Sequence, residues 1–299
     1  MLRKNKGFMF IRCNQYQYLV KKGSMSNHSY NILDENKIGI LSYLFEVTEF
    51  PLKKTDLLAN IQTKLLLPYE EASEYIENLI NHEILLDEDV SVGVKKACLF
   101  TNGEISGNID DFICTKNLGL DIEKFVLTHQ DIYSEYDADT IETALSNADV
   151  VIAMYSHFAP ALFYELNSKC VELNKMLVIA YLDGNEGVII PLSSPTKSGC
   201  YNDFEILRES SFHNLIDYQV MKESLINEDV PSPDYDSLYL ELLLLNSALI
   251  IRSSLISTYI NQFAYSYDFE RMINAKTKLM RFPNCPSCQG DSNISHPFI

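Results

Sequence analysis

Three short hydrophobic runs separated by polar residues open the chain. Aromatic and β-branched residues fill FMFIRC (residues 8–13), YQYLVKK (16–22) and YNIL (30–33), and turn-forming polar residues lie between them. This pattern predicts a small β-meander.

Apolar residues at helical spacing follow the meander and predict three short helices. The first is expected behind Asp34, a good N-cap residue, and ends at Pro51. The second begins at Thr55 and the third opens at Pro68. Their apolar positions are Ile38, Leu41, Leu44 and Phe45; Leu57, Leu58 and Ile61; and Ala72, Ile76, Leu79 and Ile80. The segment EILLDEDVSV (83–92) reads as a strand.

Three short helices followed by a strand are typical of a winged helix, a fold most often used to bind DNA. The third helix, YEEASEYIENLINHEI (69–84), contains five glutamates and neither lysine nor arginine. Such a helix would repel the phosphates that flank a major groove. A winged helix that binds a peptide fits better, and a DNA-binding regulator stays as a weaker alternative.

From residue 94 the pattern changes to apolar strands alternating with amphipathic helices. Continuous apolar runs at DVVIAMY (149–155) and MLVIAYL (176–182) flank the helical segment FAPALFYELNSKCVELN (158–174). Strands of this kind are buried on both faces, which predicts a doubly wound parallel α/β domain. We therefore expect two domains, residues 1–92 and 93–299.

The charged residues of the chain limit the kinds of partner that it can bind. The 299 residues carry 24 Lys and Arg against 41 Asp and Glu, a formal net charge of −17. That charge disfavours nucleic acid and favours a basic peptide.

The N-terminal run FMFI is too short for a signal peptide, so a cytoplasmic location is expected. The apolar stretch 237–260 contains Glu241, Asn246 and Arg252, which predicts a core helix rather than a membrane span; the sequence leaves open a homodimer contact there.

A C-x-x-C pair near the C-terminus is the strongest chemical signal. Cys285 and Cys288 lie beside prolines, whereas the other five cysteines are scattered. A close pair of this kind in a reducing compartment serves as metal ligands or as redox thiols. The six histidines show no H-E-x-x-H or H-x-E spacing, so a catalytic metal is not indicated.

Residues 144–208, together with this pair, resemble the ThiF-like adenylating proteins, relatives of ubiquitin-activating enzymes. The matching features are Leu166, Asn167 and Cys170 on the helix, the turn DGNEG, and the C-terminal C-x-x-C. In that family a first C-x-x-C completes a structural zinc site with the second. Here the first pair is replaced by Cys200 and Asp203, so the resemblance implies a zinc site of Cys200, Asp203, Cys285 and Cys288. A decayed or redox-active site is the alternative.

The resemblance also implies that this chain lacks two features by which active members of the family bind ATP and magnesium. Active members bind ATP on a glycine-rich turn, but CLFTNGEISGNIDDF (98–112) lacks the G-x-G-x-x-G spacing and places Glu104, Asp110 and Asp111 there. No aspartate for magnesium follows DVVIAMY, where the sequence is MYSHF. We therefore expect no ATP on this chain and no catalytic residue.

A ThiF-like domain without an ATP site, behind a peptide-binding winged helix, is similar to the McbB-like and SagC-like partner proteins of azole-forming cyclodehydratases. In those systems a YcaO protein uses ATP to convert Ser, Thr or Cys of a ribosomal precursor peptide into azolines, and a flavin dehydrogenase can follow. The partner's winged helix, the RiPP recognition element, binds the leader of the precursor. The active adenylation of a peptide C-terminus is the rival function.

The resemblance implies that the leader adds as a strand beside the meander and packs against the third helix. It implies that the leader contacts Tyr30, Asn31 and Ile32 on the strand and Tyr75, Leu79 and His82 on the helix. Ile32 and Leu79 fit the hydrophobic core equally well.

Overall fold

The computed structural model describes residues 1–27, 29–87, 95–116, 118–127, 138–193, 198–227, 234–257, 259–283 and 285–288. The chain divides into two compact units, Met1–Gly93 and Val94–Ile299, and each is described by itself.

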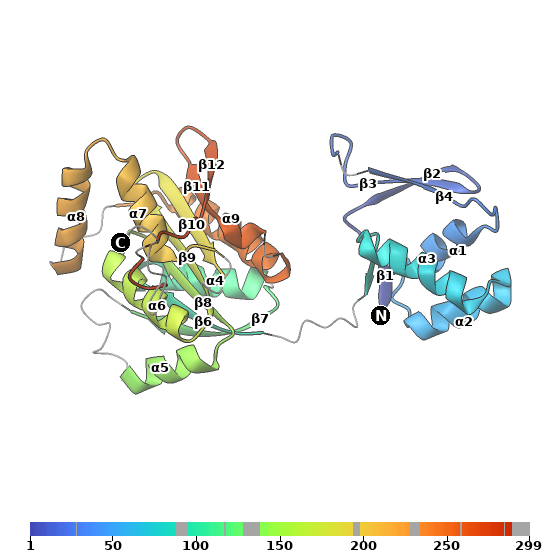
Figure 1. Ribbon diagram of the computed structural model, residues 1–299, viewed down its shortest axis with the longest axis horizontal. Coiled ribbons are helices and arrows are strands. Elements are labelled where there is room, and N and C mark those ends of the chain that lie inside the picture. The colour runs from blue at the N-terminus through green and yellow to red at the C-terminus, as the bar shows by residue number, and fades with distance from the viewer. Residues whose placement is uncertain are drawn as a thin grey trace, which may run out of the picture. The chain divides into compact units, whose positions relative to one another are not determined.

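The N-terminal unit contains the predicted meander and three helices (Figure 1). Strands β2 (Met9–Asn14), β3 (Gln17–Lys21) and β4 (Ser29–Leu33) form an antiparallel sheet in the order β2-β3-β4. Helices α1 (Ile40–Val47), α2 (Lys54–Leu65) and α3 (Tyr69–Asn81) follow, and strand β5 (Leu85–Asp87) pairs with an unpredicted strand, β1 (Leu2–Lys4). The predicted strand over 83–92 is thus confirmed at Leu85–Asp87, and residues 88–92 lie outside the described residues.

The starts of two helices differ from the predictions. α1 begins at Ile40 rather than directly after Asp34, because the intervening loop holds Lys37 and Gly39 at positive φ. The buried Asp34 carboxylate still accepts hydrogen bonds from the backbone N–H groups of Gly39 and Ile40, at 2.6 and 3.2 Å. α2 begins before Thr55, which does not cap it, whereas Pro68 lies at the N-cap of α3 as expected.

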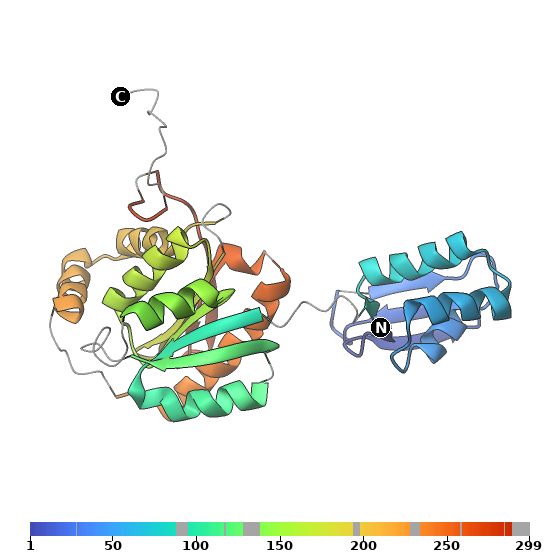
Figure 2. The same ribbon diagram turned by 90° about the horizontal axis from the view of Figure 1, so that it is seen from below.

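The second unit contains a seven-stranded sheet covered by helices on both faces (Figures 1 and 2). The parallel strands are β6 (Lys95–Thr101), β7 (Leu120–Val126), β8 (Val150–Tyr155) and β9 (Met176–Asp183). Strands β10 (Glu186–Leu192), β11 (Phe263–Asp268) and β12 (Ile273–Lys278) add antiparallel to β9, giving the order β12-β11-β10-β9-β8-β6-β7. The α/β prediction is confirmed, but the sheet is mixed and not purely parallel.

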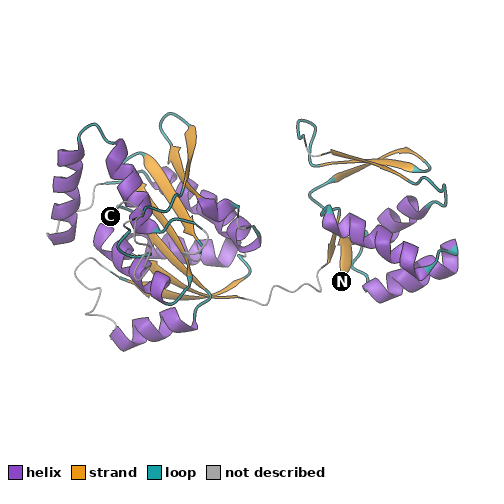
Figure 3. Ribbon diagram, viewed as in Figure 1, coloured by secondary structure: helices purple, strands orange, loops and turns teal. Residues whose placement is uncertain are grey.

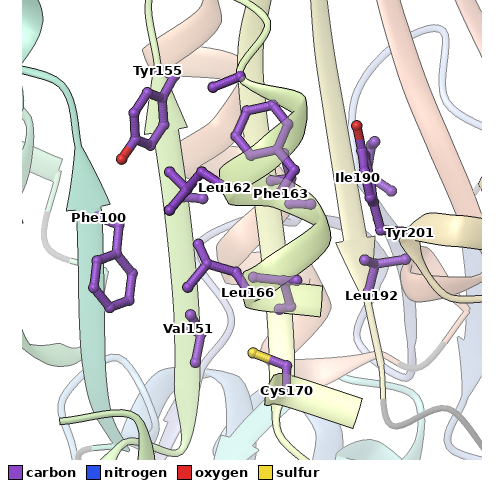
Figure 4. Packing of buried hydrophobic residues seen from close by; sticks show 14 of the residues in the cluster. Phe100, Val151, Tyr155, Leu162, Phe163, Leu166, Cys170, Ile190, Leu192 and Tyr201 are labelled. Atoms are coloured by element: carbon purple, nitrogen blue, oxygen red, sulfur yellow. The ribbon is translucent and has the colours of Figure 1, made fainter. Parts of the chain in front are cut away.

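Two hydrophobic layers hold helices against this sheet. Figure 3 shows the helices beside the strands of the sheet. α5 (Ala138–Asn147), α6 (Pro160–Glu172), α7 (Tyr201–Ser211) and α8 (Leu215–Asn227) belong to one layer. α4 (Ser106–Lys116), which follows the short η1 (Gly103–Ile105), and α9 (Ser237–Ile256) belong to the other; η2 (Ile260–Gln262) precedes β11. Figure 4 shows Phe163, Leu166 and Cys170 of α6 in the first layer, where all three are buried.

α9 packs on β9 and β10, so the predicted core helix is confirmed. By length and apolarity it is the one helix among the described residues that could cross a membrane, with 44% of its most apolar stretch buried inside the protein.

Candidate metal centre and peptide-binding edge

The four predicted metal ligands come from two segments that are distant in sequence. Cys200 directly precedes α7 and Asp203 lies in its first turn, whereas Cys285 and Cys288 follow β12. Gly199 lets the two segments approach, because a Cβ atom there would lie 2.6 Å from the backbone oxygen of Met280. Its N–H also donates to the carbonyl of Leu279, at 3.4 Å.

The ligand atoms of these four residues all lie within 4.8 Å of one another. The sulfur atoms of Cys200 and Cys285 are 3.4 Å apart, and the Cys288 thiol donates to Asp203 Oδ2 at 3.2 Å. Cys200, Asp203 and Cys285 are buried, and Cys288 is partly buried. Zinc–sulfur bonds of about 2.3 Å in a tetrahedron place sulfur atoms about 3.8 Å apart, so the spacing suits one ion.

Asp203 also satisfies backbone donors from both segments. Its Oδ2 accepts from the N–H of Cys200 at 2.8 Å, and its Oδ1 accepts from the N–H of Phe282 at 2.9 Å. The first bond belongs to a capping box at the start of α7. Oδ1 retains a second lone pair, and the second lone pair of Oδ2 would become available when the Cys288 thiol loses its proton on ligation, so these bonds are compatible with metal ligation.

Burial disfavours the thiolate forms of Cys200 and Cys288. It raises the pKa of Cys200, and burial together with the Asp203 carboxylate raises the pKa of Cys288 to about 12. The neutral thiols of these two residues are therefore favoured unless a cation offsets the negative charge. Three thiolates and a carboxylate match the ligand types of a closed zinc site, which leaves no open position for chemistry.

The predicted peptide-binding residues lie on β4 and α3, and two of them meet. The rings of Tyr30 and His82 contact edge to face, with centroids 5.3 Å apart. β4 is a terminal strand of its sheet: among the described residues it pairs only with β3. Its other edge is therefore a candidate for an added strand.

The other four predicted residues divide between the core and the surface. Leu79 is buried in the N-terminal core, and Ile32 and Tyr75 pack against that core. Burial and the nearby carboxylates raise the pKa of Tyr75. Asn31 is exposed on the opposite face of the sheet, where its amide oxygen accepts from Gln17 at 2.8 Å. Tyr30, Tyr75 and His82 thus remain the partly exposed candidates on this side.

A polar cluster lies where the chain order of the large sheet reverses, between β6 and β8. Ser156 Oγ donates to Glu104 at 2.5 Å and accepts from Asn102 at 2.7 Å, and His157 Nδ1 lies 3.2 Å away from it. Such a reversal is the usual ligand position of open α/β sheets. From the sequence, Glu104 and the segment MYSHF, which contains Ser156 and His157, are singled out here, but Asn102 is given no role, and its only signal is its place directly after a strand.

Comparison with known proteins gives similarity in fold only. No protein-family model and no curated protein matches the chain. A heterocyclase in complex with substrate and cofactor matches with a TM-score of 0.63 and 11% identity, over 96% of this chain and 39% of that one. The heterocyclase TruD matches with a TM-score of 0.63 and 12% identity, over 96% of this chain and 42% of that one. E. coli MccB with ATP matches with a TM-score of 0.55 and 12% identity, over 96% of this chain and 99% of that one.

The chain therefore spans about two fifths of the length of the two heterocyclases. It shares their mixed α/β fold, and the sequence identities support no closer statement.

Proposed function

We propose that this protein is a leader-peptide recognition and scaffolding subunit of an azole-forming cyclodehydratase. Its N-terminal unit is a winged-helix RiPP recognition element, and its second unit is a degenerate ThiF-like domain. The ATP-dependent conversion of Ser, Thr or Cys into azolines takes place on a YcaO-type partner. The similarity in fold to two heterocyclases supports this class of function.

The observation that carries the proposal is the terminal strand β4 beside α3. A leader in extended conformation adds along the unpaired edge of β4, and main-chain hydrogen bonds supply the affinity. Tyr30 and His82 flank that edge and select a side chain of the leader. The acidic residues of α3, among them Glu71 and Glu74, favour a leader that carries lysine or arginine.

In the second unit the residues of the metal centre serve the scaffold. Cys200, Asp203, Cys285 and Cys288 would hold zinc, which ties the segment after β12 to the start of α7. The site supplies stability and no reaction step.

Glu104 supports the absence of ATP chemistry on this chain. Its carboxylate accepts hydrogen bonds from Ser156 and Asn102 at the end of the parallel strands, where a nucleotide phosphate would require positive charge or free N–H donors. The rival function, adenylation of a peptide C-terminus, is favoured by the fold similarity to MccB with ATP.

Fluorescence anisotropy of a labelled precursor leader tests the proposal. The precursor encoded beside this gene should bind the full chain, and Tyr30→Ala and His82→Ala should each weaken binding about tenfold or more. Tyr69→Ala, at the opposite end of α3 and 55% exposed, is the matched control and should bind as the wild type does. Equal affinity of all variants, or ATP–pyrophosphate exchange by the isolated chain, would refute the proposal.

A further inference from the structure

The peptide-binding edge, formed by β4 and the neighbouring side of α3, has two chemically different ends. Successive residues of a strand point to opposite faces, so Tyr30, Ile32 and Asp34 share one face. Tyr30 and Ile32 pack against the N-terminal core, and Asp34, directly after β4, is buried. Tyr75 and His82 lie about two turns apart on the same side of α3. Tyr30 contacts His82 at one end, so the other end carries Asp34 and Tyr75.

The Tyr75 end of the peptide-binding edge is acidic. Besides burial, the carboxylates of Asp34, Glu35, Glu71 and Glu74 raise the pKa of the Tyr75 hydroxyl, so all four lie near it. The Asp34 carboxylate is occupied by backbone N–H groups, but the three glutamates are exposed. None of these glutamates forms an ion pair with another described residue. The described residues therefore leave the negative charge of this end uncompensated.

The Tyr30 end is aromatic and its charges are balanced. The centroid of the Tyr30 ring lies 6.1 Å from that of Phe8 and 5.3 Å from that of His82. Lys22 Nζ lies 5.1 Å from the centre of the Phe8 ring and 3.6 Å from the carboxylate of Glu83. A large apolar side chain fits this end better than a charged one, because it adds to a group of rings beside an ion pair that is already formed.

An added strand would present residues of one face to both ends. Tyr30 and Asp34 are four residues apart, so the two residues of the added strand that face these ends are also four residues apart. The sheet of β2, β3 and β4 is antiparallel throughout, and antiparallel pairing is the more stable kind per residue. The N-terminal part of an antiparallel added strand lies beside Asp34, and its C-terminal part lies beside Tyr30.

We infer that the peptide-binding edge selects a leader segment in which Lys or Arg lies four residues before a large apolar residue. The cation lies among the glutamates around Tyr75, and the apolar residue lies beside Tyr30 and His82. The inference rests on the proposed function and adds to it the register and the direction of the leader. Glu77 takes no part in this selection, because it forms an ion pair with Lys54 of α2.

A charge scan of the leader tests this register. Each Lys and Arg in the leader of the neighbouring precursor is replaced singly by Glu, and binding to the full chain is measured by fluorescence anisotropy. One replacement should weaken binding about fivefold or more, and Ala in place of the apolar residue four positions later should do the same. Glu71→Lys of the chain should weaken binding of the unchanged leader by a similar factor. The same variant should bind the weakened Glu-containing leader more tightly than the wild-type chain does.

Glu70→Lys is the matched control for Glu71→Lys. Both glutamates are exposed in the first turn of α3, so the two substitutions change the net charge and the helix end equally. Glu71 lies about 40° around the helix axis from Tyr75, whereas Glu70 lies about 140° from it. Glu70→Lys should therefore bind the leader as the wild type does, to within about twofold.

The outcomes separate this inference from the proposed function. Equal weakening by Glu70→Lys and Glu71→Lys, a leader that binds without such a pair of residues, or the reverse order of the pair would overturn the inference and leave the proposed function standing. A wild-type chain that binds no part of the leader would overturn both.

Discussion

Asp203 links the candidate metal centre to the backbone of both segments that form it. A cysteine at this position would complete the four-cysteine set of the ThiF-like family, but it would remove the acceptor of two backbone N–H groups. A buried donor that loses its acceptor costs about 1–3 kcal/mol. The carboxylate therefore holds α7 and the segment around Phe282 together whether or not an ion is bound.

We predict that Asp203→Cys makes the fold more dependent on zinc. The variant should retain zinc, measured by inductively coupled plasma mass spectrometry, because four thiolates are a good zinc site. After chelation its free energy of unfolding should fall below that of chelated wild type by about 2 kcal/mol, measured by urea denaturation.

Two cysteine variants control this experiment. Cys285→Ser should lose the zinc, whereas Cys13→Ser, at an exposed position of β2, should keep it. Zinc retention by Cys285→Ser would contradict the ligand set, and equal unfolding free energies of chelated wild type and Asp203→Cys would contradict the bridging role of Asp203.

At the residue scale, the sequence predicts which residues lie close together. It predicts less well which contacts each of those residues makes. The spacing of the cysteines and the resemblance brought Cys200, Asp203, Cys285 and Cys288 together, as they are in the structure. The hydrogen bond from Phe282 to Asp203 was not predictable, because it depends on the tertiary approach of two segments 79 residues apart. The same holds for Asn102, whose contact with Ser156 requires adjacent β6 and β8.

At the element scale, the packing of the segment after β12 against the start of α7 depends on Gly199. We predict that Gly199→Ala lowers the free energy of unfolding by about 1–3 kcal/mol and weakens zinc retention, because its Cβ would displace Met280. Urea denaturation with zinc present measures the first effect.

Gly107→Ala is the matched control, since no atom lies within 4 Å of a Cβ at that position. It lies in α4, where alanine is the better helix former, so its stability should be unchanged or up to about 1 kcal/mol higher. Equal effects of the two substitutions would contradict the close approach.

Strong periodicity explains which elements were predictable. β8, β9, α6 and the meander carry long apolar or alternating patterns, and all are present. β10 was missed because Pro191 argues against a central strand; its pairing with β11 ends at Ile189, so the proline lies beyond the part that is paired on that side. β12 is exposed throughout and is specified by its pairing with β11 rather than by an apolar pattern of its own.

At the scale of the whole molecule, the proposed function assigns peptide binding to the N-terminal unit and a scaffold role to the second unit of an acidic chain. The net charge of −17 favours a basic leader and disfavours nucleic acid. The fold class was predictable because alternating strands and helices leave few arrangements. The YcaO-type partner and the precursor leader were predicted only from the resemblance to a family, because the residue pattern of a single chain does not specify which protein it binds.

Co-expression of the tagged chain with its neighbouring genes, followed by mass spectrometry of all retained proteins, tests the central claim most directly. We predict recovery of a short precursor peptide rich in Ser, Thr or Cys, together with a larger ATP-using protein of the YcaO type. Recovery of the chain alone, with a bound adenylate or with ATP–pyrophosphate exchange of its own, would contradict the recognition-subunit account and identify a working nucleotide site beside Glu104.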